Sequence, residues 1–177
     1  MWVKWAKLAA LCSLAAALAV ATPGCVADIS TAEPVLAFSD LLGDVGGDAE
    51  VVVTAAGMER GLGGLAVGTG GGPGLQYDPS QFQVRAVEGL GGFDVLAWAI
   101  DNAAGEVRFV AVDPVASPTD GEVVKIVGER LAGEQFPFRV DKGNLQLVDG
   151  DGTSLGEDEF AVITGGAPPY YARGRRR

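Results

Sequence analysis

The residues of this chain that could carry out chemistry are its carboxylates and two cysteines, because the 177-residue sequence contains no histidine. The chain therefore lacks the commonest general base and the commonest metal ligand. A Ser–His–Asp site is excluded, and a zinc site is disfavoured. Paired carboxylates could still act as acid and base, but no two of them stand at a spacing that singles them out. We therefore expect no catalytic residues and no enzyme.

One acidic motif, Asp-Gly-Asp-Gly at residues 149–152, has the hard oxygen ligands that calcium requires. An EF-hand loop starting at Asp149 would need Gly at its sixth position and Glu at its twelfth. Ser154 and Phe160 stand there, so the EF-hand is excluded. Two interpretations stay open: an Asp-Gly turn between strands, or a surface calcium site held by Asp149 and Asp151. No other cofactor is expected.

A glycine-rich stretch, GLGGLA at residues 61–66, matches the G-x-G-x-x-A pattern of dinucleotide sites. Such a site must open a helix, and the next residues are VGTGGGPG, which cannot sustain one. The segment is therefore expected to connect two strands.

The two cysteines bear on export. Residues 1–24 combine a basic start, MWVKWAK, with an apolar run from Leu8 to Ala21, which predicts a signal-peptide helix too short to span a membrane. The following TPGC, ending at Cys25, resembles a bacterial lipobox, although Thr22 stands where Leu is usual. Because Cys12 lies inside the leader, the mature chain can form no internal disulfide. We expect lipid attachment at Cys25, which would hold the protein at a membrane surface; plain secretion is the alternative.

The charge of the chain is strongly uneven. All 23 acidic residues lie between Asp28 and Glu159, and only seven basic residues share that span, which gives it a net charge of −16. Such a surface repels phosphate backbones, so nucleic acid is excluded as a partner. It would suit a basic partner or divalent cations, or simply keep an exported protein soluble.

The body of the chain consists of short β-type runs separated by Gly, Asp-Pro or Asp-Gly, without a helical pattern after the leader. This predicts an all-β, jelly-roll β-sandwich of about nine strands. The predicted organisation is a signal peptide at 1–24, a tether at 25–48, the sandwich at 49–165 and a disordered basic tail at 166–177. The tail could contact an acidic surface.

Alternation along the runs predicts which side chains face the core. Two inward sets are expected: Val107, Phe109 and Ala111 in one strand, and Phe82, Val84 and Ala86 in another. Trp98, in the middle of a third strand, is expected to pack between the sheets. Arg85 and Arg108 are expected to point outward.

Four motifs, in order, resemble cohesin domains. They are YDP at 77–79, IDNAAGEVRFVAVD at 100–113, DGEVVKIVG at 120–128 and LQLVDGDG at 145–152. The resemblance implies a nine-stranded jelly-roll sandwich with no catalytic site, whose members bind dockerin modules, small calcium-loaded helical domains, through one flat sheet face. Related sandwiches bind carbohydrate. The chain departs from the pattern where TGGGPG at 69–74 interrupts a strand that should be continuous.

We therefore predict a cohesin-like recognition module, exported and either lipid-anchored at the cell surface or secreted, with a dockerin-type or other protein partner. Arg85 and Arg108 are the predicted partner-binding residues, since a binding sheet presents alternate side chains on one face. Two alternatives stay open. A carbohydrate-binding module would bind polysaccharide through a row of exposed aromatic rings. A structural envelope lipoprotein would need no discrete ligand.

Overall fold

The computed structural model describes residues 33–115, 121–133 and 136–165, which belong to one compact unit. The predicted leader, Cys25 and the predicted basic tail lie outside these residues. The described part consists of strands, turns and two single 3₁₀ turns at 142–144 and 157–159. No helix in these ranges is long and apolar enough to cross a membrane. The prediction of an all-β chain is confirmed.

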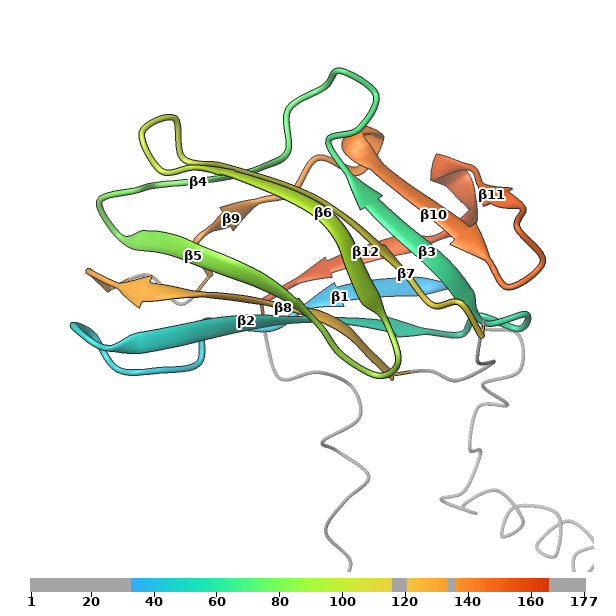
Figure 1. Cartoon of the computed structure of the whole chain (residues 1–177), viewed down its shortest axis with the longest axis horizontal. Helices are drawn as coiled ribbons and strands as arrows, with labels where there is room; N and C mark the ends of the chain where they lie inside the picture. Colours follow the sequence, from blue (N-terminus) through green and yellow to red (C-terminus); the bar gives the residue numbers. More distant parts are fainter. Residues whose placement is uncertain (1–32, 116–120, 134–135, 166–177) are drawn as a thin grey trace, which may run out of the picture. The chain divides into compact units, whose positions relative to one another are not determined.

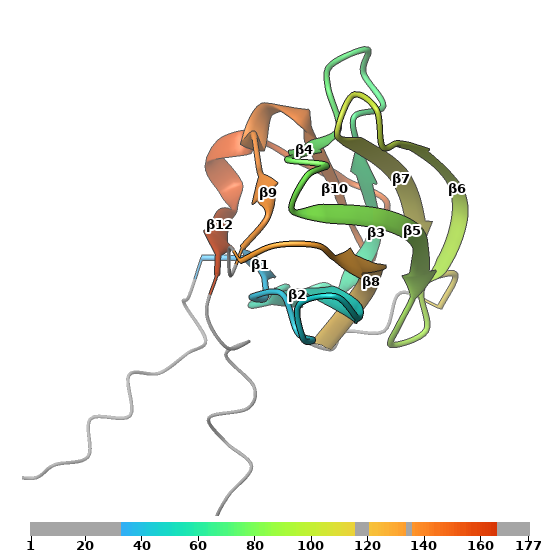
Figure 2. The same ribbon diagram turned by 90° about the vertical axis from the view of Figure 1, so that its left-hand side faces the viewer.

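The strands form two facing sheets, named sheet A and sheet B (Figures 1 and 2). Sheet A has the order β12 (Ala161–Thr164), β1 (Val35–Phe38), β2 (Asp48–Ala56), β8 (Gly121–Arg130), β5 (Phe82–Gly89). Sheet B has the order β11 (Ser154–Leu155), β10 (Leu145–Asp149), β3 (Leu62–Val67), β7 (Glu106–Val112), β4 (Leu75–Tyr77), β9 (Phe138–Arg139), and β6 (Asp94–Asp101) pairs with β7.

Sheet B contains interrupted strands. β3 and β4 lie one after the other along the same β7, with Val67 opposite Phe109 and Leu75 opposite Val107. β10 and β9 pair in turn with β3 and β4. When β3 and β4 are counted as one strand, β9 and β10 as another, and the two-residue β11 is set aside, the described part has the nine strands that were predicted. The interruption between β3 and β4 is the glycine-rich segment that departs from the cohesin pattern.

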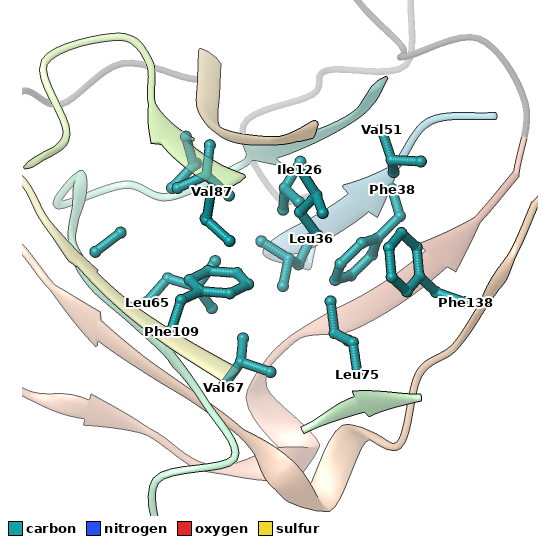
Figure 3. Close-up of a cluster of buried hydrophobic side chains, with 14 of the residues drawn as sticks. Leu36, Phe38, Val51, Leu65, Val67, Leu75, Val87, Phe109, Ile126 and Phe138 are labelled. Atoms are coloured by element: carbon teal, nitrogen blue, oxygen red, sulfur yellow. The ribbon is translucent and has the colours of Figure 1, made fainter. Parts of the chain in front are cut away.

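The core lies between the sheets and takes large apolar side chains from both (Figure 3). Phe38 and Ile126 come from sheet A, and Leu65 and Phe109 from sheet B; all four are almost fully buried. Truncating a buried Phe to Ala typically costs about 3–5 kcal/mol. The predicted inward set of Val107, Phe109 and Ala111 is buried, so the alternation in β7 is confirmed.

A β-bulge in β5 changes the predicted alternation of that strand. Phe82 and Val84 are buried as expected, but the register with β8 shifts between Val84 and Ala86. Arg85 is the extra residue. As a result Ala86 pairs with Val127 and stays half-buried, while Val87 enters the core. The prediction for Ala86 was wrong because a bulge puts two residues opposite one and reverses the alternation beyond it.

Trp98 was predicted to pack between the sheets, and this prediction was wrong. It lies opposite the buried Phe109, so it belongs to the inner side of β6. β6, however, pairs only with β7 among the described strands and forms a lateral edge of the sandwich, where Trp98 is 52% exposed. The alternation of a strand gives the side of a residue and does not give its depth.

The Tyr-Asp-Pro turn joins the two sheets. The Tyr77 hydroxyl donates to Asn102 Oδ1 at 2.6 Å. The same carboxamide pairs with the Val84 backbone of sheet A, accepting from its N–H at 3.0 Å and donating to its C=O at 2.9 Å. Asp78 caps the turn, because its Oδ1 accepts the Ser80 N–H at 2.9 Å. These hydrogen bonds hold the β6–β7 hairpin beside β5.

The sandwich begins earlier than predicted. Val35–Phe38, inside the segment expected to be a tether, form β1, which lies between β2 and β12. Leu36 and Phe38 are almost fully buried. The four-residue run VLAF is too short to show alternation, so only its neighbours in the sheet reveal it as a strand.

Candidate interaction face

The two arginines predicted to bind a partner lie on opposite sheets. Arg85 extends from β5 in sheet A and pairs with Asp48 and Glu129. Arg108 extends from β7 in sheet B and donates from Nε to Glu106 at 2.8 Å. The structure therefore does not bring Arg85 and Arg108 together, and an interface on one sheet face can include only one of them.

The outer face of sheet A is occupied by charged side chains that pair with one another. Besides the contacts of Arg85, Lys125 Nζ lies 3.0 Å from Glu88 and 3.8 Å from Glu50. The contact with Glu88 is the main reason why the pKa of Lys125 is raised. A partner placed here would have to displace these pairs or bury them, and burying ion pairs carries a desolvation cost.

The outer face of sheet B differs in both charge and relief. Asp94 lies at one end of this face, opposite Val112. In the middle of the face, the residues that alternate with the core positions are uncharged and mostly small, and we call them the uncharged strip: Gly64 and Ala66 of β3, Ala97 and Ala99 of β6, Val110 and Val112 of β7, Gln146 and Val148 of β10.

The strip is continuous across the sheet. Ala66 lies opposite Val110, which in turn lies opposite Ala97. A Cβ added at Gly64 would be in van der Waals contact with the side chains of Val148 and Val112, so these two valines flank the glycine. Because the side chains are short, the strip is a shallow surface over which larger side chains of another molecule could pack.

A charged cluster closes the strip at the β6–β7 hairpin. Asp101 and Glu106 lie opposite each other in the register, with Arg108 beside Glu106. A cavity of about 250 Å³ opens there, lined by Ala99, Ile100 and the three charged residues. The hydrogen bond from Arg108, followed by the one from the Gly74 N–H, lowers the pKa of Glu106, so this carboxyl is ionised at neutral pH.

The loop between β3 and β4 borders the strip on another side. Gly68 N–H donates to the Asn144 carbonyl at 2.9 Å, and Thr69 Oγ1 lies 3.2 Å from Gln146 Oε1. At its other end Gly74 donates to Glu106. The loop leaves the sheet between β3 and β4 (Figure 1). The hydrogen bonds at its two ends tie it to the sheet.

Exposed aromatic residues do not form a row. Among the described aromatic side chains only Trp98 is exposed; Phe93 is half-buried and packs against the core. The pair Tyr170–Tyr171 lies outside the described residues. A carbohydrate platform needs several rings in line, so the described residues give no specific support to the carbohydrate alternative.

The Asp-Gly-Asp-Gly segment forms a turn after β10. Asp149 Oδ1 accepts the N–H groups of Asp151 at 3.0 Å and Thr153 at 2.8 Å. Arg60 reaches both carboxylates, at 3.8 Å from Asp149 and 3.3 Å from Asp151. No group of three metal-binding side chains occurs in the described ranges. Calcium binding by Asp149 and Asp151 stays a prediction, and a bound ion would have to compete with the Arg60 guanidinium.

The glycine-rich stretch at 61–66 mostly belongs to β3, so it does not open a helix. A Cβ at Gly63 would overlap the Asp149 carbonyl, so glycine permits the close approach of β10. The expectation that this stretch connects two strands was wrong, because all of it except Gly61 is itself a strand.

Sequence reasoning did not identify most residues of this face. Asp101 and Glu106 lie inside the motif at 100–113 but were not proposed as binding residues, and Ala97 and Ala99 lie in no motif; only Arg108 was proposed. A usable signal was present in the small residues that alternate along β6, because Ala at an outward strand position leaves the surface shallow.

Comparisons with known proteins agree on the fold. No family model matches the sequence, and no curated protein matches it. Among solved structures, a cohesin of Clostridium acetobutylicum is 19% identical, with a TM-score of 0.53 over 77% of this chain and 94% of that one. The cohesin of a type II cohesin–X-dockerin complex from Acetivibrio cellulolyticus is 16% identical, with a TM-score of 0.56 over 76% and 97%.

A third structure, a type I cohesin–dockerin complex from Clostridium thermocellum, is 13% identical, with a TM-score of 0.52 over 75% of this chain and 96% of the matched one. Each of these three cohesin structures is thus matched over nearly its whole length by this chain. The resemblance to cohesins is confirmed at the level of the fold: this chain has the cohesin fold.

Proposed function

We propose that this protein is a non-catalytic recognition module that binds a protein partner through the outer face of sheet B. The observation that carries the proposal is the contrast between the two outer faces. Sheet A presents charges that are already paired, whereas sheet B presents the uncharged strip. The centre of a protein interface is depleted of charge, and the uncharged strip has that character.

We propose a dockerin-type module as the partner. Support comes from the fold, since two of the similar cohesin structures were solved as complexes with dockerins. The strip also suits a rigid partner, because its strands are hydrogen-bonded across the whole sheet and can accept a preformed surface without rearranging.

A matched pair of substitutions tests the face. Ala97→Glu places a carboxylate in the strip on β6, and Ala86→Glu places the same group on the outer side of β5 in sheet A. Binding of purified dockerin modules, with and without calcium, is measured by calorimetry. Ala97→Glu is expected to weaken binding about tenfold or more, because it buries a charge without a partner. Ala86→Glu is expected to bind as the wild type does.

The opposite ranking of the two variants would assign recognition to sheet A. If no dockerin module binds in either calcium condition, the dockerin proposal is wrong. The two variants would then be tested with a protein retained from the native envelope.

We further propose that the module is exported and anchored through a lipid on Cys25. The support is the apolar leader followed by the TPGC motif. Labelling with a fatty-acid analogue in the native host is expected to be lost in Cys25→Ala and kept in Cys12→Ala, which removes the other cysteine. Equal labelling of Cys25→Ala and the wild type would contradict the anchor.

A further inference from the structure

The cavity at the β6–β7 hairpin offers a place for one side chain of a partner that lies on the uncharged strip. Its volume of about 250 Å³ opens directly beside Ala99, one of the strip residues. Ala99 lies opposite Arg108 in the register, and its methyl group is too short to fill the space between them. A partner on the strip would therefore meet the cavity without any movement of the strands.

The charges around the cavity are not balanced. Glu106 is compensated by Arg108, and it also accepts the Gly74 N–H. Asp101 takes part in no ion pair of the described residues. Its Oδ1 accepts the N–H groups of Ala103 and Ala104, both at 2.9 Å, which closes the hairpin turn. One carboxylate charge thus remains at the mouth of the cavity.

The charge of Asp101 affects two neighbouring titratable groups, Glu106 and Tyr77. Burial is the main cause of the raised pKa of Tyr77, and the negative charge of Asp101 adds to it. The same charge acts to raise the pKa of Glu106. In Glu106 the hydrogen bonds from Arg108 and Gly74 outweigh it. A second cation beside Asp101 would relieve the repulsion between the two carboxylates.

We propose that this cavity is a specificity subsite that receives a lysine or arginine side chain of the protein partner, with Asp101 as the group that pairs with the cation. The apolar stem of such a side chain would lie against Ala99. The inference rests on the proposed function, since it assumes that a protein lies on the uncharged strip. It adds a charge requirement: a partner with an acidic residue at this place would be rejected.

The subsite can be tested without knowing the partner. The probe is N-acetyl-arginine amide, with neutral N-acetyl-glutamine amide as the control, added at constant ionic strength to the ¹⁵N-labelled full-length protein. Amide shifts are recorded by NMR. The arginine probe is expected to shift the amides of residues 99–108 saturably, and the glutamine probe is expected not to.

Three variants sharpen the test. Asp101→Asn removes the charge but keeps an oxygen that can cap the hairpin turn, and it is expected to weaken the arginine probe about threefold. Ala99→Leu fills the cavity without changing any charge and is expected to abolish the saturable shifts. Glu50→Gln removes a carboxylate from the outer face of sheet A and is expected to change nothing.

The subsite is ruled out if the arginine probe gives no saturable shift, if Asp101→Asn and Ala99→Leu both bind it as the wild type does, or if the shifts map to sheet A. None of these results depends on Ala97→Glu, so failure of the subsite and failure of the recognition face are told apart.

Discussion

The side chain of Asn102 connects the two sheets through hydrogen bonds of the kind that normally join two backbones. Its carboxamide forms both hydrogen bonds of a backbone pair with Val84 and also accepts the Tyr77 hydroxyl. Tyr77 is buried. The Tyr-Asp-Pro and Asp-Asn motifs, which are far apart in the sequence, thus meet in one joint.

This joint leads to a prediction about stability. Asn102→Ala leaves the Val84 N–H, its C=O and the Tyr77 hydroxyl without this partner, and we expect it to lower the free energy of unfolding by about 2–4 kcal/mol. Tyr77→Phe removes only the hydroxyl and should cost about 1 kcal/mol. Chemical denaturation measures both. Equal costs for the two variants would show that the pairing with Val84 adds nothing.

Residue-scale prediction from the sequence succeeded where strands are regular. Val107, Phe109 and Ala111 were assigned correctly because β7 pairs on both sides and has no bulge. Ala86 was misassigned because the bulge at Arg85 depends on the register with β8, which a single strand does not encode. Trp98 was misassigned because its exposure depends on the lateral position of β6 in the sheet.

At the scale of elements, the segment between β3 and β4 interrupts a strand and yet remains tied to the sheet. Glycine is needed at particular positions of this segment. A Cβ at Gly74 would overlap the Val107 carbonyl of the neighbouring strand, whereas a Cβ at Gly70 would come no closer than 3.6 Å to any atom. The segment therefore contains positions that exclude a side chain, Gly74 among them, and a position that accepts one, Gly70.

This difference gives a matched test within one loop. Gly74→Ala is expected to lower the free energy of unfolding by about 1–3 kcal/mol, because β4 must move away from β7 or lose its pairing. Gly70→Ala should stay within about 0.5 kcal/mol of the wild type. Thermal unfolding followed by circular dichroism compares them. A neutral Gly74→Ala would mean that β4 is not held against β7.

The number and type of elements were predictable, but the site was not. Short β-type runs separated by turn residues were enough to predict a sandwich of about nine strands. The uncharged strip combines residues from four strands, β3, β6, β7 and β10. Its composition depends on which strands are neighbours, and this pairing is a property of the sheet. Arg85 and Arg108 looked equivalent in the sequence because the sequence does not show that β5 and β7 belong to different sheets.

At the scale of the whole molecule, β1 completes the sandwich. It pairs antiparallel with β2 and parallel with β12, so it connects the beginning of the described chain to its end. The predicted boundary at residue 49 would have removed it.

Truncation distinguishes the two boundaries. A chain beginning at Glu33 is expected to fold with the same cooperative unfolding transition as the longer protein. A chain beginning at Ala49 loses Leu36 and Phe38 from the core and leaves β12 without a neighbour, so we expect it to be unfolded or aggregated. Circular dichroism and size-exclusion chromatography check this. If the chain beginning at Ala49 folds, the fold does not need β1, and the predicted boundary between tether and sandwich is correct.

The parallel pairing of β1 and β12 also determines how the domain carries tension. Val35 stands beside Ala161 and Phe38 beside Thr164, so the chain enters this pair at one end and leaves it at the other. A pull between the preceding and following segments acts along both strands and loads their hydrogen bonds in shear. The bonds must then break together and not in succession, which makes β1–β12 a mechanical clamp.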